Sequence, residues 1–375
     1  MRHKKTLFCA ADAYALIGGI QSFNRRVIRH LGEFSRSGAI ACARVMLHKE
    51  TPADLPKDLG VECLCAGSSH LTYVLVFLRE IFSAETLLIG HIDLLPLAAA
   101  ARLLRPSLPI VLFVHGDEVW NDPKHRLMRW YEPWILKSVS LIAAVSNFTI
   151  QRMSAEFKVP LARFRLFPNA VDELETVSPR ETTSPVVLTV TRLGIGDREK
   201  NVDKVIRAFA MLKGRVPNAV YEIIGDGCLR PELEKLASQL GIADRVRFLG
   251  RISDCELNEA LKRASLFVLP SSKEGFGIVY LEAWQRGIPV ICGADGAPSE
   301  IISDGIDGFV VNSDALGALE ERMYQLLTDN DLNRQFGNQG IAKVQSKYLD
   351  CHFGSRLKAI LMDSGASECN ICSVT

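Results

Sequence analysis

The sequence predicts an α/β protein made of two doubly wound, Rossmann-like domains in series. Three observations support this fold class. Apolar runs of strand length alternate with helical patterns over most of the chain, one polar stretch interrupts the alternation, and the same alternation then starts again. A chain of 375 residues is also too long for one ordinary hydrophobic core, whereas it fits two domains.

The N-terminal domain is expected to span residues 1–172. Helical patterns at 20–35 and 96–104 separate its apolar runs, which is the arrangement of a parallel sheet with crossover helices. Ligands bind such sheets at the carboxyl ends of the strands, where loops lead into helices. Its strands are predicted at residues 6–11, 39–46, 87–90, 110–115, 141–145 and 163–167.

Residues 173–185 interrupt this pattern, because they are polar, include Pro179 and Pro185, and show no apolar periodicity. We interpret them as an interdomain linker. The second domain is expected over residues 186–335, and two sheets with facing loop edges would form an interdomain cleft. Its strands are predicted at 186–190, 219–224, 246–249, 266–269, 290–292 and 308–311, with helices at 201–213, 231–240, 256–264 and 279–286.

The composition narrows the function classes. The formal net charge of +1 gives no basis for nucleic-acid binding. The cysteines stand mostly alone in apolar runs, and the close pairs, Cys63 with Cys65 and Cys369 with Cys372, lack companions at zinc-ligand spacing, so no metal site is predicted. Reduced cysteines fit the cytoplasm. The apolar run at 6–11 is too short for a signal peptide, and no apolar run of about 18 residues predicts a membrane span.

Gly18 and Gly19 lie after the first predicted strand and directly before a helix. Glycines at such a position let backbone amides approach a phosphate, and the helix dipole favours the anion by roughly 0.3–1 kcal/mol. A simple tight turn explains the pair equally well. The G-x-G-x-x-G fingerprint of a dinucleotide site is absent from this loop, which argues against a dehydrogenase.

His115 ends another predicted strand and is followed by a glycine and two acids, Asp117 and Glu118. This position places an imidazole at the ligand-binding edge of the sheet, where it could act on a substrate. The alternative is a histidine that only satisfies hydrogen bonds at the end of a strand.

Two cations flank the first loop of the second domain. Arg192 follows a predicted strand and Lys200 precedes the next helix, and a guanidinium and an ammonium that converge there suit a diphosphate. Arg198 competes with Lys200 for this role, and all of these charges could instead be solvated. Gly225 follows the next strand, where it either keeps the backbone close to a ligand or forms a bare turn.

The segment from Glu274 to Glu282 carries the most chemistry. Gly275 and Gly277, at the start of a helix, would free backbone amides for a phosphate. Glu282 could accept hydrogen bonds from both hydroxyls of a ribose, and Glu274 could face the transferred group. Each acid alone could be an ordinary helix-start acid or a cap, whereas the whole constellation favours a functional site.

These residues resemble the retaining glycosyltransferases of GT-B architecture that form glycosyltransferase family 4. Glu274 to Glu282, with Phe276 between the two glycines, is similar to the family's E-x7-E motif, and Gly18-Gly19 to its N-terminal glycine loop. Further similar segments follow in family order between about residue 16 and about residue 312. They are Val145-Ser146-Asn147, Pro168-Asn169-Ala170-Val171-Asp172, Arg192 with Lys200, Gly225-Asp226-Gly227 and residues 293–300.

The resemblance implies that a sugar moves from a UDP- or GDP-sugar to a saccharide or lipid-linked saccharide, in surface polysaccharide biosynthesis. It implies retention of anomeric configuration, with no metal or other cofactor. Glu274 and His115 would contact the donor sugar, Arg192 and Lys200 the diphosphate, and Glu282 the ribose. The remaining donor-binding residues would be Gly18, Gly19, Asn169, Gly225, Gly275, Phe276 and Gly277.

The resemblance also implies that helices over 336–363 cross back to the first domain, ahead of a flexible tail at 364–375. Three departures from the family pattern stand out. Ala170 replaces the usual glycine, and the spacing from Arg192 to Lys200 exceeds a compact R-x4-K. The segment Ala297-Pro298-Ser299-Glu300 interrupts the simple P-E pair of the family.

A basic and aromatic segment, residues 124–137, includes Trp130 and Trp134. Such a segment could meet an anionic membrane surface, and an ordinary amphipathic helix accounts for it equally well. Membrane binding would favour a lipid-linked acceptor and would place a cytoplasmic enzyme peripherally on the inner face of the membrane.

Two other functions are compatible with this layout. A nucleotide-sugar 2-epimerase would release the nucleotide and alter the sugar without an acceptor, so acceptor dependence separates it from a transferase. A non-catalytic nucleotide-sugar-binding protein is disfavoured, because Arg192, Glu274 and His115 together exceed what binding alone requires.

Overall fold

The computed structural model describes residues 5–16, 18–123, 126–174 and 184–363, and it divides into two compact units. Unit 1 comprises Met1–Asn169 and Asp350–Thr375, and unit 2 comprises Ala170–Leu349. The first boundary lies three residues before the expected one. Most of the expected linker, 175–183, and the expected tail, 364–375, lie outside the described residues.

Unit 1 contains a parallel sheet of seven strands in the order β3-β2-β1-β4-β5-β6-β7. Six of its strands match the predicted ones to within a few residues, whereas β3 was not predicted. The strands are β1 (Lys5–Ala10), β2 (Cys42–Leu47), β3 (Glu62–Cys65), β4 (Thr86–Ile89), β5 (Ile110–Val114), β6 (Leu141–Ala144) and β7 (Phe164–Leu166).

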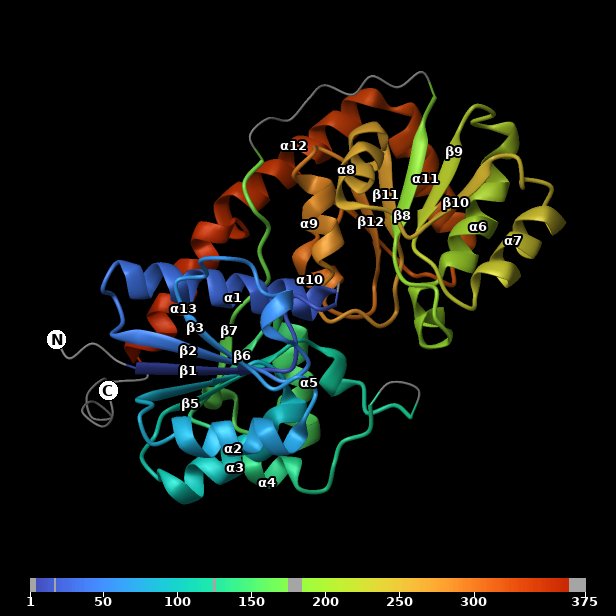
Figure 1. Ribbon diagram of the computed structural model, residues 1–375. Coiled ribbons are helices and arrows are strands. Elements are labelled where there is room, and N and C mark those ends of the chain that lie inside the picture. The colour runs from blue at the N-terminus through green and yellow to red at the C-terminus, as the bar shows by residue number, and fades with distance from the viewer. Residues whose placement is uncertain (1–4, 17, 124–125, 175–183, 364–375) are drawn as a thin grey trace, which may run out of the picture. The chain divides into compact units, whose positions relative to one another are not determined.

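Helices cover both faces of this sheet (Figure 1). One face is covered by α2 (His70–Glu80), α3 (Leu95–Leu104), α4 (Glu132–Leu136) and α5 (Asn147–Phe157), which share one hydrophobic core with the strands. The opposite face is covered by α1 (Gly19–Arg36) and the last helix, α13 (Asp350–Asp363).

The helix α13 is held in unit 1 by both apolar and ionic contacts. The buried ring of Phe353 packs edge-on against Phe23 of α1 and against Phe167. At the start of the helix, the Asp350 carboxylate pairs with Arg26 and lies 3.0 Å from Nε2 of His30. These contacts explain why the last helix groups with the N-terminal unit.

The sheet of unit 2 has six parallel strands in the order β10-β9-β8-β11-β12-β13. They are β8 (Val186–Val190), β9 (Val220–Ile224), β10 (Val246–Gly250), β11 (Leu266–Leu269), β12 (Val290–Gly293) and β13 (Gly308–Val311). The helices are α6 (Val202–Met211), α7 (Arg230–Gln239), α8 (Asp254–Arg263), α9 (Ile278–Trp284), α10 (Pro298–Ile301), α11 (Leu316–Thr328) and α12 (Asn330–Lys347).

The helix α12 belongs entirely to unit 2, so the expected boundary between residues 335 and 336 falls inside it. Packing explains the difference. Phe336 is buried in the core of unit 2, and Gly337 lies so close to the backbone of Gly287 that a Cβ there would stand 2.1 Å from its carbonyl oxygen. Of the expected segment 336–363, only α13 groups with unit 1.

Both sheets run outward from their first strand in both directions, the strand order of doubly wound nucleotide-binding folds, which confirms the predicted fold class. The order reverses between β1 and β4 in unit 1 and between β8 and β11 in unit 2. Ligand sites in such sheets lie beyond the carboxyl ends of the strands at this point. None of the described helices combines the length and apolar character needed to cross a membrane.

Candidate active site

In unit 2, Lys200 and Glu274 form an ion pair beside the strand-order reversal. Glu274 lies in the loop that follows β11, and Lys200 ends the 3-10 helix η5 (Ile195–Lys200) that follows β8. Lys200 Nζ lies 2.6 Å from Glu274 Oε2, and the side chains are 17% and 18% exposed. Residues 74 positions apart, both predicted for the site, therefore meet at its expected edge.

Backbone and amide hydrogen bonds hold the two loops together around this pair. The amide nitrogen of Ser272 donates to the carbonyl oxygen of Glu199 at 2.8 Å. The Asn201 side chain donates to the carbonyl oxygen of Pro270 at 2.7 Å, from a residue whose φ of 58° turns the chain out of η5 into α6. These bonds on either side of Lys200 hold its backbone beside the loop that carries Glu274.

Arg192 follows β8 and presents its guanidinium to solvent. Its side chain is 82% exposed and its only described partner is Asp197, at 3.3 Å from Nη2 to Oδ1. An ion pair this exposed stabilises little, so the guanidinium can turn toward an anionic ligand at small cost. Arg198, the competitor of Lys200, instead pairs with Glu232 of α7, with 2.6 Å between Nη2 and Oε2.

The glycine segment before α9 has a conformation that requires glycine at one position. Gly277 caps the helix with a φ of +85°, in the left-handed region. Phe276 is 3% exposed, and its ring packs edge-on against Tyr348. The Phe276 side chain therefore supports the loop through packing, while Gly275 and Gly277 set the path of the backbone beside Glu274.

Glu282 lies on α9, one turn beyond its first residue, and is partly buried. Its carboxylate accepts no hydrogen bond from the residues that the structure describes. Burial raises the pKa of this carboxyl to about 7, against the opposing influence of Arg286. An ionised carboxylate here would be well placed to gain from two ribose hydroxyls, because it lacks partners of its own.

The raised pKa of Glu282 predicts a pH-dependent stability. Between its ordinary value near 4.5 and about 7, the folded chain holds a proton that the unfolded chain has released, so stability falls as pH rises. Relative to Glu282→Gln, the free energy of unfolding of the wild-type chain is expected to fall by about 1–3 kcal/mol between pH 5 and pH 8. Urea unfolding at the two pH values measures this difference. Glu259→Gln, at an exposed position of α8, should show no such trend.

Gly225 and Gly227 at the end of β9 are required by packing within unit 2. A Cβ on Gly225 would stand 1.7 Å from the carbonyl oxygen of Thr191, and one on Gly227 would stand 2.3 Å from that of Leu193. The backbones that follow β8 and β9 thus lie so close together that no side chain fits at Gly225 or Gly227. The sequence allowed Gly225 to approach a ligand or to form a bare turn, and this close approach gives it a role in the architecture of the turn.

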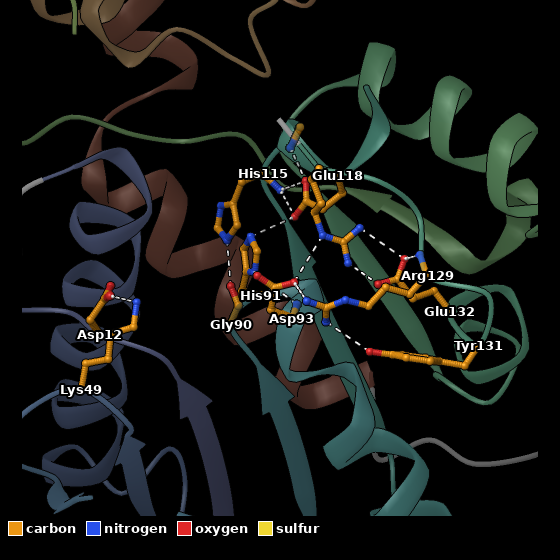
Figure 2. A network of polar contacts seen from close by, with 12 residues as sticks. Asp12, Lys49, Gly90, His91, Asp93, His115, Glu118, Arg129, Tyr131 and Glu132 are labelled. Atoms are coloured by element: carbon orange, nitrogen blue, oxygen red, sulfur yellow. Dashed lines mark hydrogen bonds and ion pairs between the residues drawn. The ribbon is translucent and has the colours of Figure 1, made fainter. Parts of the chain in front are cut away.

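In unit 1, His115 follows the carboxyl end of β5, and its ring points to the carbonyl oxygen of Gly90 (Figure 2). Its Nε2 lies 2.8 Å from the carbonyl oxygen of Gly90, and because a carbonyl only accepts, this nitrogen carries a hydrogen. Burial lowers the pKa of His115, with Glu118 opposing and His91 adding to the effect. A neutral ring of this tautomer presents Nδ1 as an acceptor for a sugar hydroxyl.

A polar network around His115 was not predicted from the sequence. The carboxylate of Glu118, which is fully buried, accepts from the amide nitrogens of His115 and Gly116 at 3.0 and 2.7 Å. The ring of His91 stacks on His115 with 5.9 Å between centroids, and its Nε2 lies 3.9 Å from Glu118. Glu118 thus orders the loop after β5.

The network continues from His91 to two arginines (Figure 2). Nδ1 of His91 lies 3.4 Å from Asp93, which is also 3.3 Å from Nε of Arg126 and 3.4 Å from Arg129. Arg126 is held in turn by the fully buried Glu132. Burial lowers the pKa of His91, but Asp93 and Glu118 more than offset this and raise it overall.

Gly18 and Gly19 lie at the start of α1, with Gly18 in extended backbone. A Cβ on Gly19 would meet no atom within 4 Å, and one on Gly18 would meet only the end of the Gln21 side chain. Protein packing therefore does not demand glycine at Gly19. Asn169 is the last residue of the first segment of unit 1, and it is half-buried. No group of three or more metal-ligating side chains occurs within the described ranges.

Two family models match the chain in adjoining segments. Residues 68–173 match the model described as Glycosyltransferase Family 4, and residues 171–343 match the model described as Glycosyl transferases group 1. Together they cover the chain without a gap from residue 68 to residue 343. Both predicted carboxylates, both predicted cations and His115 lie within this span.

Relatives and solved structures extend the similarity over nearly the whole chain. A GDP-mannose-dependent monoacylated alpha-(1-6)-phosphatidylinositol monomannoside mannosyltransferase of Corynebacterium glutamicum is 26% identical, over 96% of this chain and 98% of the relative. The alpha-D-kanosaminyltransferase of Streptomyces kanamyceticus is 28% identical, over 89% and 85%. Anabaena HepE, solved with UDP and glucose, shares the fold with a TM-score of 0.76 and 17% identity, over 96% and 100%.

The matches to both glycosyltransferase family models identify the chain as a glycosyltransferase, and its two doubly wound sheets have the GT-B fold of its solved neighbours. The chain belongs to glycosyltransferase family 4, as the sequence resemblance indicated.

Proposed function

We propose that the enzyme transfers a sugar from a UDP- or GDP-sugar to a saccharide or lipid-linked saccharide, with retention of configuration and without a metal ion. The observation that carries this proposal is the Lys200–Glu274 ion pair beside β11, with the exposed guanidinium of Arg192 after the neighbouring strand β8. Two cations supply the positive charge that a departing diphosphate requires.

Glu274 has a separate role in this proposal. Its ion pair with Lys200 holds the carboxylate in place, next to the cation that would meet the diphosphate. A carboxylate there can accept hydrogen bonds from the hydroxyls of the donor sugar. In unit 1, His115 would accept a further sugar hydroxyl at Nδ1, since Nε2 is committed to Gly90.

The acceptor proposal draws on the relatives. The Corynebacterium relative is named as acting on a phosphatidylinositol mannoside and the Streptomyces relative as transferring kanosamine. We infer a glycan or glycolipid acceptor, in surface polysaccharide biosynthesis on the cytoplasmic side of the membrane.

Nucleotide-sugar screening followed by a transfer assay tests this function. A true donor is expected to raise the melting temperature, since it binds only the folded chain. Incubation of that donor with candidate acceptors, with and without EDTA, should then give an acceptor-dependent product whose anomeric configuration by NMR equals that of the donor. An acceptor-independent 2-epimer would instead identify an epimerase, and loss of transfer in EDTA would contradict metal independence.

A further inference from the structure

A buried carboxylate binds the loop that leads from β1 to α1. This carboxylate belongs to Glu50, which follows β2 and is fully buried. The amide nitrogens of Ala13 and Tyr14 donate to Oε1 of Glu50, and the amide nitrogen of Ala15 donates to the same oxygen at 3.2 Å. Successive amides that converge on one oxygen form the kind of concave turn that binds an anion. In this chain the anion is a side chain of the protein itself.

Side chains of α1 fix the rest of this loop. The Asn24 side chain donates to the carbonyl oxygen of Asp12 at 2.8 Å, and the Gln21 side chain donates to the Asp12 carboxylate at 2.7 Å. The oxygen of the same Gln21 carboxamide lies beside Gly18, where an added Cβ would meet it. The ammonium of Lys49 lies 3.5 Å from the Asp12 carboxylate (Figure 2). The loop is therefore held from α1 and from the segment after β2.

The backbone at the start of α1 is open by comparison. A Cβ on Gly19 would meet no atom within 4 Å, so the protein does not fill the space beside this residue. A loop that is held firmly up to an accessible helix start is preorganised for an anionic group of a ligand. Glu50 supplies part of this preorganisation, because it occupies the amides that precede the helix start.

The second carboxylate oxygen of Glu50 indicates that stability alone does not account for this residue. Oε2 is buried and has no hydrogen-bond partner among the residues that the structure describes. A buried polar atom without a partner costs free energy, and most buried polar atoms in proteins avoid this cost. The contribution that offsets the cost here is the hold of Oε1 on the amides of the loop.

We infer that Glu50 is a positioning residue for sugar transfer, an inference that rests on the proposed function. Its carboxylate takes the place of a bound anion in the loop after β1 and so sets the path of the backbone toward Gly18 and Gly19. These glycines are the residues of unit 1 that we expect beside the donor diphosphate. A displaced loop would misplace them while the donor contacts of unit 2 stay intact, so the loss should fall on kcat rather than on donor binding.

Chemical rescue of Glu50→Ala tests this role with the full chain. The kcat for transfer is expected to fall at least about tenfold. The donor Kd, measured by isothermal titration, should stay within about threefold of wild type, because Lys200 and Glu274 are unchanged. Added acetate can bind the vacated amides and should raise kcat of the variant at least about fivefold, whereas chloride at equal ionic strength should not. The kcat of the wild-type chain should not respond to acetate.

Glu80→Ala provides the matched control. Glu80 is also a buried acid of unit 1, 3% exposed, but it pairs with Arg44 and Arg79 at the end of α2. Its loss is expected to lower the melting temperature and to leave kcat of the folded enzyme unchanged, with or without acetate. If Glu50→Ala fails to fold, Glu50→Gln carries the comparison, because a neutral oxygen holds the amides more weakly and should lower kcat at least about threefold.

Hydrogen exchange provides a readout that needs no turnover. In Glu50→Ala the amides of Ala13, Tyr14 and Ala15 should exchange faster than in the wild type, and acetate should slow them again. Wild-type kcat in the folded variants, or a loss of kcat that acetate does not restore, overturns the positioning role. Unchanged exchange in Glu50→Ala overturns the anchoring itself. Absence of acceptor-dependent transfer by the wild-type chain instead rejects the proposed function, so the two failures are distinguished.

Discussion

Replacement of Lys200 with methionine is expected to lower kcat/KM for sugar transfer by about 10²–10³-fold, because it removes the cation positioned beside the Glu274 carboxylate. Methionine keeps the length of the side chain but provides no charge for the departing diphosphate. The measurement is steady-state transfer with the donor identified by thermal shift. Since Lys200 is only partly buried, the variant should fold and melt within a few degrees of the wild type.

A second ion pair in unit 2 supplies the control. Lys204 of α6 pairs with Asp314 at 2.6 Å, the same separation as between Lys200 and Glu274. Lys204→Met therefore removes a comparable salt bridge outside the site and is expected to leave kcat/KM unchanged. If Lys200→Met and Lys204→Met behave alike, or if Lys200→Met retains near-normal turnover, the role assigned to Lys200 is wrong.

The variant Glu274→Gln distinguishes two roles of Glu274, hydrogen bonding to the donor sugar and the ion pair with Lys200. Glutamine still accepts hydrogen bonds from a sugar but cannot balance the ammonium of Lys200. If Glu274 acts only by positioning Lys200, the double variant Lys200→Met with Glu274→Gln should be no slower than Lys200→Met alone, because effects within one unit are not additive. A further loss in the double variant would show that Glu274 contributes separately, as expected for a residue that contacts the donor sugar.

The sequence predicted the fold because parallel strands buried on both faces are continuous apolar runs. Val186–Val190, Leu266–Leu269 and Gly308–Val311 match the predicted ranges residue for residue. The strand Glu62–Cys65 was missed because it has only four residues, lies at the edge of the sheet and is only partly buried. The helix α12 was divided wrongly, because the glycine contacts that hold it to unit 2 have no local sequence signal.

Four of the candidate site residues were chosen from the sequence because they follow the end of a predicted strand. Glu274, Lys200, Arg192 and His115 all lie in such loops, so topology alone places them at the ligand-binding edge of their sheets. His91 also follows a strand, β4, and its position beside a glycine was the signal available for it. Glu118 and Glu132 could not be assigned, because a buried acid and an exposed acid look the same in sequence.

The exposed apolar side chains of unit 1 were recognised from the sequence only in part. Those around Trp130 belong to the basic and aromatic segment that the sequence shows. The exposed apolar row from Leu71 to Phe82 was not recognised, because a helix that is apolar on two faces reads in sequence as an ordinary buried helix. Only the exposures of the individual side chains distinguish a core helix from one with an unpartnered face.

Gly225→Ala is expected to produce the largest loss of stability in unit 2. The new Cβ would stand 1.7 Å from the Thr191 carbonyl oxygen, and the φ of +127° disfavours any L side chain. Relief would require β8 and β9 to separate at their carboxyl ends, where the amide nitrogen of Thr191 donates to the carbonyl oxygen of Ile224 at 2.9 Å. We expect a loss of about 3 kcal/mol or more in the free energy of unfolding, measured by urea denaturation.

Gly241→Ala isolates the steric part of this effect. Gly241 also has a positive φ, +65°, but a Cβ there would meet only the end of Lys213 at 3.6 Å. Its substitution should therefore cost only the conformational penalty, about 1 kcal/mol. Equal losses for the two variants would contradict the close approach of β8 and β9.

The same variant decides between the two roles that the sequence allowed for Gly225. If the glycine serves architecture alone, the folded fraction of Gly225→Ala should bind the donor with a Kd close to wild type, because the Lys200–Glu274 pair lies beside β11 rather than β9. If its backbone also contacts the nucleotide, the Kd should rise even where the variant is fully folded. Isothermal titration at low temperature, well below the melting transition, makes this comparison, and the donor Kd of Gly241→Ala provides the reference for a glycine substitution away from the site.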